Sequence, residues 1–202
     1  MTATYNARSL MPLFSAWLTL ALAFALSGVF PRLPPPAAPG LIFGTTLLVG
    51  ATVWRTPSLR RAALRLDLRW LVAVHVVRAF VGLWFLSLGR EGLLHPRFVA
   101  IAGPGDIVAG AAALVALIAL TKAPPPLARR VTLTFNVIAA IDICAVIVTA
   151  QSILFFGPGI ASMRGFFRFP GPLIPSLLVP LVLLTHAMIA HRLRATAAST
   201  PQ

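Results

Sequence analysis

The sequence predicts an all-α membrane protein, a bundle of six transmembrane helices with both termini in the cytoplasm. Of the 202 residues, 58% are hydrophobic and only 10% are charged. A soluble domain carries about 25% charged residues, which it needs to cover its surface. The apolar residues form long continuous runs rather than short alternating segments, which favours helices over a β-barrel. Basic residues gather in the short connections, more of them on one side of the predicted membrane than on the other.

The spans are placed where an apolar run approaches the roughly 20 residues needed to cross ~30 Å of hydrocarbon. We place them at about residues 10–30, 37–54, 70–88, 98–120, 131–156 and 173–190, in a single integral membrane domain of residues 1–202. The first run follows Arg8 and contains Ala23-Phe24-Ala25, as a cleaved signal peptide would. Because the run continues past that site, a retained span is favoured. The second span is short and depends on a start near Pro39, since proline suits the first helical turn.

The later spans carry features that shape them. Span three begins at Trp70, an aromatic residue typical of the membrane interface. Span four contains Gly103-Pro104-Gly105, which we expect to break its helix. Span six contains Pro175 and Pro180, which we expect to kink it.

The basic residues predict the orientation. With the N-terminus inside, the cytoplasmic segments carry Arg8, Arg55, Arg60, Arg61, Arg65, Arg69, Lys122, Arg129, Arg130, Arg192 and Arg194. The outer segments carry fewer, namely Arg32, Arg90, Arg97, Arg164 and Arg168. This asymmetry predicts an N-in/C-in topology. The net charge of +13 therefore reflects topology, and we expect no nucleic-acid partner. The expected partners are the lipid bilayer and a second copy of the chain or a larger membrane complex.

Arg78 is the most informative polar residue. It lies near the middle of span three, where an arginine costs on the order of 3 kcal/mol and has to find a partner. Two carboxylates, Asp106 and Asp142, fall inside predicted spans, so we expect Arg78 to pair with one of them. Such a pair either fixes helix packing or forms a charge relay or an anion-binding site. One arginine with two aspartates leaves one aspartate able to bind a proton or a cation.

Asp106 admits two interpretations, because it directly follows the Gly-Pro-Gly run. A break within the membrane would expose backbone beside a charge, as in the discontinuous helices of transporters. If the membrane helix instead starts at Ile107, Asp106 is a helix cap at the interface.

Three further polar residues complete the candidate set. Asn136 lies in span five, six residues from Asp142 and therefore on another part of the helix surface. His186 lies towards the inner end of span six, and His75 shares a helix face with the arginine three residues after it. The two histidines lie at similar depth and could ligate a b-type haem, although a lone buried histidine is more often a packing residue and we expect no cofactor. The single cysteine, Cys144, excludes an internal disulfide and a cysteine-based metal site, and we expect no metal.

From span three onward the sequence resembles a widespread uncharacterised family of small multi-pass bacterial inner-membrane proteins. The residues that carry the resemblance are Val77-Arg78-Ala79-Phe80 with Gly82, Phe98-Val99-Ala100, Ala102 through Gly110, Asn136-Val137-Ile138 with Ile141-Asp142, Leu173-Ile174-Pro175 with Val179-Pro180, and His186. The resemblance implies an inner-membrane helical bundle. It supports Arg78, Asp106, Asn136, Asp142 and His186 as candidate positions and brings no substrate; His75 lies outside the pattern.

The function predicted from these observations is that of a small transporter or permease in which Asp142 or Asp106 exchanges a proton. A non-catalytic membrane subunit or assembly factor is an alternative, with the polar residues serving packing alone. A membrane-embedded redox enzyme, or one acting on a lipid or quinone, is a further alternative. The sequence leans against an enzyme, since it contains no phosphate-binding loop after a strand, no recognisable nucleophile elbow and no His-x-x-Glu-His helix.

Overall fold

The computed structural model describes residues 7–34 and 36–198, and helices with short connections make up all of that part of the chain. Within it, five helical segments are long and apolar enough to cross a membrane: Ala37–Arg55, Leu68–Arg90, Pro96–Lys122, Pro125–Phe156 and Ile174–Ala195. The helix α1 (Met11–Leu26) is apolar but has only 16 residues. It ends earlier than expected because Gly28, with φ of 65°, turns the chain, a conformation that suits glycine. The count of six spans therefore stays a prediction.

The chain divides into two compact units, of which the first comprises Met1–Asp67 and Phe166–Leu184. Its elements are the 3₁₀ turns η1 (Ala7–Leu10) and η2 (Phe30–Arg32), α1, α2 (Ala37–Arg55), α3 (Pro57–Arg65), the π-helical turn η5 (Ile174–Leu178) and the first part of α8 (Val179–Ala198). Both α1 and α2 pack on η5, and the indole of Trp17 on α1 donates to the carbonyl of Ser176 at 3.0 Å. This bond satisfies a polar atom in an otherwise apolar contact.

The helix α3 was expected to be a connecting loop. It forms because Pro57 occupies the first turn and because two small residues, Ala62 and Ala63, fall on one face and are buried. That face packs against η1 and α2, while the arginines Arg60, Arg61 and Arg65 stay exposed. The guanidinium of Arg60 lies 4.4 Å from the ring centre of Trp54.

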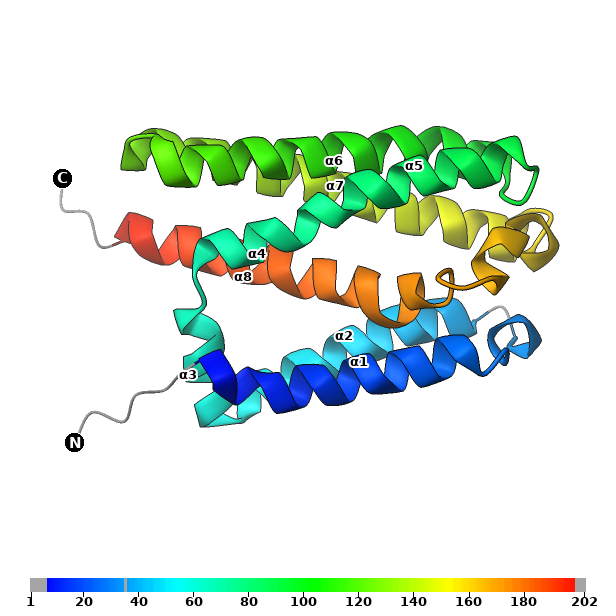
Figure 1. Ribbon diagram of the computed structural model, residues 1–202, viewed down its shortest axis with the longest axis horizontal. Coiled ribbons are helices and arrows are strands. Elements are labelled where there is room, and N and C mark those ends of the chain that lie inside the picture. The colour runs from blue at the N-terminus through cyan, green and yellow to red at the C-terminus, as the bar shows by residue number, and fades with distance from the viewer. Residues whose placement is uncertain (1–6, 35, 199–202) are drawn as a thin grey trace. The chain divides into compact units, whose positions relative to one another are not determined.

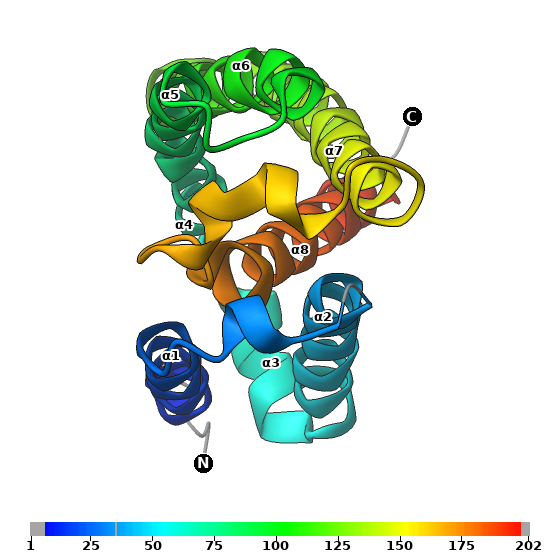
Figure 2. The ribbon, with the colours of Figure 1, turned by 90° about the vertical axis from the view of Figure 1, so that its right-hand side faces the viewer.

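The second unit comprises Leu68–Gly165 and Thr185–Gln202 and holds the candidate site. Its elements are α4 (Leu68–Ala73), the 3₁₀ turn η3 (Val74–Val76), α5 (Val77–Arg90), α6 (Pro96–Lys122), α7 (Pro125–Phe156), most of the 3₁₀ segment η4 (Ile160–Phe167) and the last part of α8. The helix α6 packs along both α5 and α7 (Figures 1 and 2). The three helices supply most of the candidate side chains.

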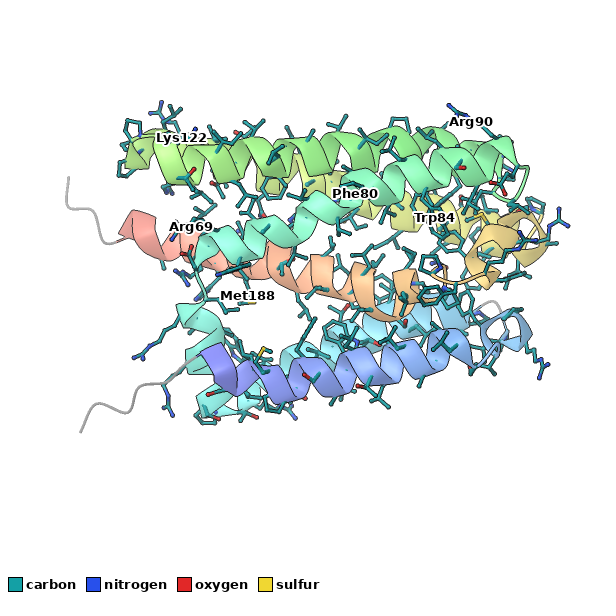
Figure 3. The ribbon with its side chains drawn as sticks, in the orientation of Figure 1. Arg69, Phe80, Trp84, Arg90, Lys122 and Met188 are labelled. Atoms are coloured by element: carbon teal, nitrogen blue, oxygen red, sulfur yellow. The ribbon has the colours of Figure 1, made fainter. Side chains whose placement is uncertain are left out.

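Basic side chains lie at both ends of this unit (Figure 3). Arg69 and Lys122 lie at one end, Arg90 lies at the other, and the exposed Phe80 lies between them. An apolar middle between basic ends is the arrangement of a membrane-spanning bundle.

The helix α6 corrects both interpretations of Asp106, since it runs through Gly103-Pro104-Gly105 without a break. Asp106 is therefore neither next to a discontinuity nor a cap, and it lies in the helix interior with 4% of its surface exposed. The φ angle of proline suits a helix, and membrane helices tolerate proline because neighbouring helices and local adjustments compensate for the missing N–H. The two glycines serve contacts with neighbouring helices, as described below.

Span three was expected to be a uniform helix and span six a kinked helix, but each contains an irregular helical turn. In span three, the 3₁₀ turn η3 contains His75 and separates α4 from α5. In span six, the π-helical turn η5 contains Pro175, whose missing N–H removes one helical hydrogen bond. Short π-helical turns are frequent at functional sites.

Candidate functional site

A buried ion cluster joins three helices of the second unit. Arg78, in the first turn of α5, donates from Nε to Oδ1 of Asp106 on α6 at 2.6 Å. Its Nη1 donates to the carbonyl of Ala139 on α7 at 3.0 Å, and its Nη2 donates to Oδ2 of Asp142, also on α7. The expected ion pair is therefore confirmed, and the arginine binds both candidate aspartates rather than one of them.

The two aspartates differ in exposure. The side chains of Arg78 and Asp106 are 2% and 6% exposed, while that of Asp142 is 16% exposed. With both carboxylates ionised, the cluster carries one negative charge in excess of its arginine. All three guanidinium nitrogens already donate to the protein, so Arg78 is occupied and oriented. This arrangement weakens the hypothesis of an anion-binding arginine and favours a proton or a cation at a carboxylate.

Glycines allow the helices of the cluster to approach one another. A methyl group on Gly82 of α5 would lie 2.9 Å from the backbone nitrogen of Ile107 on α6. A methyl group on Gly110 of α6 would lie 2.5 Å from the backbone nitrogen of Ala79 on α5. Contacts of this kind, between small residues, are typical of closely packed membrane helices. They bring α5 near enough to α6 for the arginine to reach Asp106 with its Nε.

Gly105 has a different neighbour. A methyl group there would collide with Oδ1 of Asp142, whose Cγ would be 2.9 Å away. The bare backbone of Gly105 therefore makes room for this carboxylate between α6 and α7. Gly103 faces Leu86 of α5, so the two glycines of the Gly-Pro-Gly run serve two different helix contacts.

A second polar cluster contains the two buried histidines. His75 in η3 and His186 in α8 have 0% and 6% of their surfaces exposed, and their ring centres are 4.3 Å apart. The Nε2 atom of His75 lies 3.0 Å from Oγ1 of Thr185. Phe135 of α7 packs edge-on against His75, with the ring centres 5.2 Å apart. The histidines therefore meet at a junction of three helical elements.

Asn136 of α7 holds His186 through two hydrogen bonds. Its Oδ1 lies 2.8 Å from Nδ1 of His186, and its Nδ2 donates to the backbone carbonyl of the same residue at 3.4 Å. Because the amide nitrogen is committed to the carbonyl, Oδ1 is the acceptor and Nδ1 of His186 carries the hydrogen. The other ring nitrogen of neutral His186, Nε2, is then an acceptor.

Two imidazole nitrogens lack partners in this second cluster. Nδ1 of His75 and Nε2 of His186 are buried and make no hydrogen bond within residues 7–34 and 36–198. An unsatisfied buried polar group costs about 1–3 kcal/mol. Such groups are therefore rare in native proteins, and these two nitrogens call for an explanation.

The candidate residues thus form two groups. The ion cluster brings together Arg78, Asp106 and Asp142, and the histidine cluster brings together Asn136, His186 and His75. Asn136 and Asp142 make separate contacts, as their spacing on the helix predicted. Sequence reasoning missed the carbonyl of Ala139 and the hydroxyl of Thr185. No sequence pattern indicates which backbone carbonyl will accept a side-chain hydrogen bond. The threonine directly before His186, by contrast, could have been recognised in the sequence as a candidate partner.

The two histidines do not fit a haem held between them. A porphyrin with two axial imidazoles lies between their rings, and rings with centres 4.3 Å apart are in contact with each other. Within the described residues, no group of three or more His, Cys, Asp or Glu side chains is placed to hold a metal ion.

A family described as a domain of unknown function (DUF8737) matches residues 35–194, which include both polar clusters. The chain belongs to this family. Comparison with curated proteins and with solved structures finds no match. The membership supports the resemblance to an uncharacterised family, while its bacterial inner-membrane placement stays a prediction.

Proposed function

We propose that this DUF8737 protein is a multi-pass protein of the bacterial inner membrane, with six spans and both termini in the cytoplasm. Its five long apolar helices support this placement, as do many large apolar side chains on the surface, among them Phe80 at 68% and Trp70 at 71% exposure. The orientation rests on the excess of arginine around α3 and in the other segments assigned to the cytoplasm. The sixth span is α1, whose 16 residues require local thinning of the bilayer or flanking residues that reach the interface.

Within that membrane, the protein acts as a small transporter or permease whose ion cluster binds and releases a proton. The observation that carries this proposal is the binding of one buried guanidinium by two carboxylates from two helices. In a membrane interior an excess negative charge is costly, and a proton on one carboxylate removes it. Intramembrane carboxylates of this kind serve as proton relays in pumps and transporters.

Asp142 is the aspartate that exchanges the proton. Its side chain is the more exposed of the two, and the bare backbone of Gly105 makes room for its carboxylate. Asp106 is the more buried of the two aspartates and binds Nε of Arg78. It therefore serves to hold the arginine in place.

The test is proton flux in vesicles. The full chain is reconstituted in liposomes containing a pH-sensitive dye, and a potassium diffusion potential drives protons inward. We expect the wild type to acidify the lumen faster than protein-free vesicles, and Asp142→Asn to lower that rate at least tenfold. Glu91→Gln is the matched control, because Glu91 is an exposed carboxylate outside the cluster. Wild-type flux equal to that of empty vesicles, or full flux in Asp142→Asn, would contradict the proposal.

A non-catalytic subunit or assembly factor is the alternative that a specific observation favours. Every guanidinium nitrogen of Arg78 is bonded within the protein, as a purely structural lock would require. This alternative predicts that Asp142→Asn lowers thermal stability in detergent. The wild type would then carry no protein-dependent flux.

A further inference from the structure

We infer that His75 and His186 form a second proton-binding site, which holds one proton on one or the other of two neighbouring imidazoles and exchanges it with the ion cluster. This inference rests on the proposed proton exchange at Asp142 and extends it to a second group of residues. It starts from the two buried ring nitrogens that make no hydrogen bond in the described part of the chain. A proton requires no cavity, so a tightly packed pair of rings can bind it.

The hydrogen bonds of the pair define where the proton is accepted. Asn136 orients His186 so that Nδ1 donates and Nε2 presents a lone pair. Protonation forms an N–H bond at Nε2 and places one positive charge on the ring, while Nδ1 keeps its hydrogen bond. Loss of that proton restores the neutral ring. Neither step involves a change of oxidation state.

His75 is the second carrier of this proton. Its Nε2 contacts Oγ1 of Thr185, a hydroxyl that can donate or accept, so His75 can take either neutral tautomer or the charged form. Its Nδ1 is the other nitrogen without a partner. The ring centres are 4.3 Å apart and the two unpaired nitrogens make no hydrogen bond with each other, so the pair offers two separate acceptors, one fixed and one adaptable.

The pair holds one proton and not two. At an effective dielectric of about 20, two unit charges at this separation repel strongly enough to weaken the second proton on the order of a thousandfold. Arg78, one turn from His75 on the same face, adds to that repulsion. The carboxylates that face this region are Asp106 on α6 and Asp142 on α7, and both are bound to the arginine.

Other charged groups on the packed helices lie further along them. On α8 the nearest are His191 and Arg192, more than one helical turn beyond His186. On α7 the nearest charged residue in the N-terminal direction is Arg130, more than one turn before Phe135. The protonation of the pair is therefore controlled by the ion cluster and by the two rings themselves.

The two clusters share a segment of α7. Asn136, which holds His186, lies one turn before Ala139, whose carbonyl accepts from Arg78. Asp142 lies one further turn along the same helix. A change in the ionisation of Asp142 thus acts on a helix that also orients His186, and α7 contributes a residue to each of the two proton sites.

The first arm of the test observes the pair directly in the wild type. Nitrogen-15 histidine labels in the full-length protein, reconstituted in nanodiscs, report by NMR the tautomer and charge of each ring over a pH titration. We expect His186 to keep its Nδ1–H at all pH values and the pair to gain one imidazolium, and no second one, as the pH falls before the protein unfolds. Charging of neither ring, independent charging of both rings, or a hydrogen on Nε2 of neutral His186 would overturn the inference.

The second arm measures proton flux in the vesicle assay described above. We expect His186→Gln and His75→Gln each to lower flux at least tenfold, and His191→Gln, on the same helix outside the pair, to leave it unchanged. Loss of flux in Asp142→Asn with full flux in both glutamine variants would overturn the transfer of protons through the histidine pair and leave the proposed function standing. A single imidazolium on the pair in a protein without flux would refute the proposed function and the transfer step, while the proton-binding pair itself would stand.

Discussion

Substitution of Arg78 by methionine tests whether the ion cluster is one mutually compensated unit. Methionine replaces the apolar stem of the arginine with an unbranched apolar chain and removes all three donors that bind Asp106, Ala139 and Asp142. Two carboxylates are then left in the interior without a counter-charge. We expect this variant to fold with markedly lower stability.

The magnitude follows from the burial and the bonding of the arginine. Arg78 is 1% exposed, so no water replaces its hydrogen bonds to the carboxylates. Removal of one partner from a buried ion pair costs about 3–5 kcal/mol, because an uncompensated charge stays behind. We therefore expect Arg78→Met to lower the free energy of unfolding by about 3–5 kcal/mol at neutral pH. The cost should shrink at low pH, where protonated carboxyls no longer need a counter-charge.

The matched control removes the charges together. In the triple variant Arg78→Met/Asp106→Asn/Asp142→Asn no charge stays buried, and replacing a whole buried ion cluster is often close to neutral. We expect the triple variant to recover part of the lost stability, because only neutral polar groups then stay buried without the donors of Arg78. The double variant Asp106→Asn/Asp142→Asn, which strands the guanidinium, should be as unstable as Arg78→Met.

Equilibrium unfolding in mixed detergent micelles, followed by circular dichroism, measures these differences. The reasoning is refuted if the triple variant is no more stable than Arg78→Met, since the cost would then come from lost packing volume and not from unpaired charge. It is also refuted if Arg78→Met unfolds like the wild type, because the arginine would then contribute no net stabilisation.

Three further predictions follow from single contacts. Gly82→Ala should destabilise the protein by about 1–3 kcal/mol in the same unfolding assay, because the methyl group of the alanine meets the rigid backbone of α6 at Ile107. Unchanged stability would show that α5 and α6 can separate freely. Trp17→Phe should cost at least about 1 kcal/mol, because it removes the hydrogen bond to the carbonyl of Ser176 and part of a buried ring; unchanged stability would show that neither contributes. Cys144 is exposed near the middle of α7, so lipid should cover its thiol in the membrane. It should therefore resist a charged, membrane-impermeant maleimide in intact membranes and react with it after unfolding in dodecyl sulfate. Labelling is read as a mass increase, and rapid labelling of the intact protein would contradict the membrane placement.

Continuous apolar runs and composition were enough to predict the helices. Spans two to six coincide with long apolar helices in the structure, because a continuous apolar run in a membrane can satisfy its backbone only as a helix. Boundaries were less accurate: α7 begins at Pro125, six residues before the predicted start at 131, since polar residues can continue a helix beyond the hydrocarbon. The helix α3 was missed because it is short and its few apolar residues lie between arginines.

Tryptophan shows how local signals can mislead. An aromatic residue at a span end was expected to mark the membrane interface, and Trp54 and Trp70 are exposed near helix ends. Trp17, by contrast, is buried in the first unit and bonded to Ser176. Its partner lies 159 residues away in sequence, so only folding could reveal this role.

The sequence alone determined that the chain is helical and apolar and that a few ionisable side chains must lie in its interior, because those properties follow from residue composition and the cost of burying charge. Which of those side chains meet was decided only by the tertiary structure. Arg78 binds both aspartates because glycines at 82, 105 and 110 allow three helices to approach within the reach of one guanidinium. His75 joins His186 because η3 and α8 converge, although the two residues are 111 positions apart. Contacts between distant segments depend on how helices pack, and no local pattern encodes that packing.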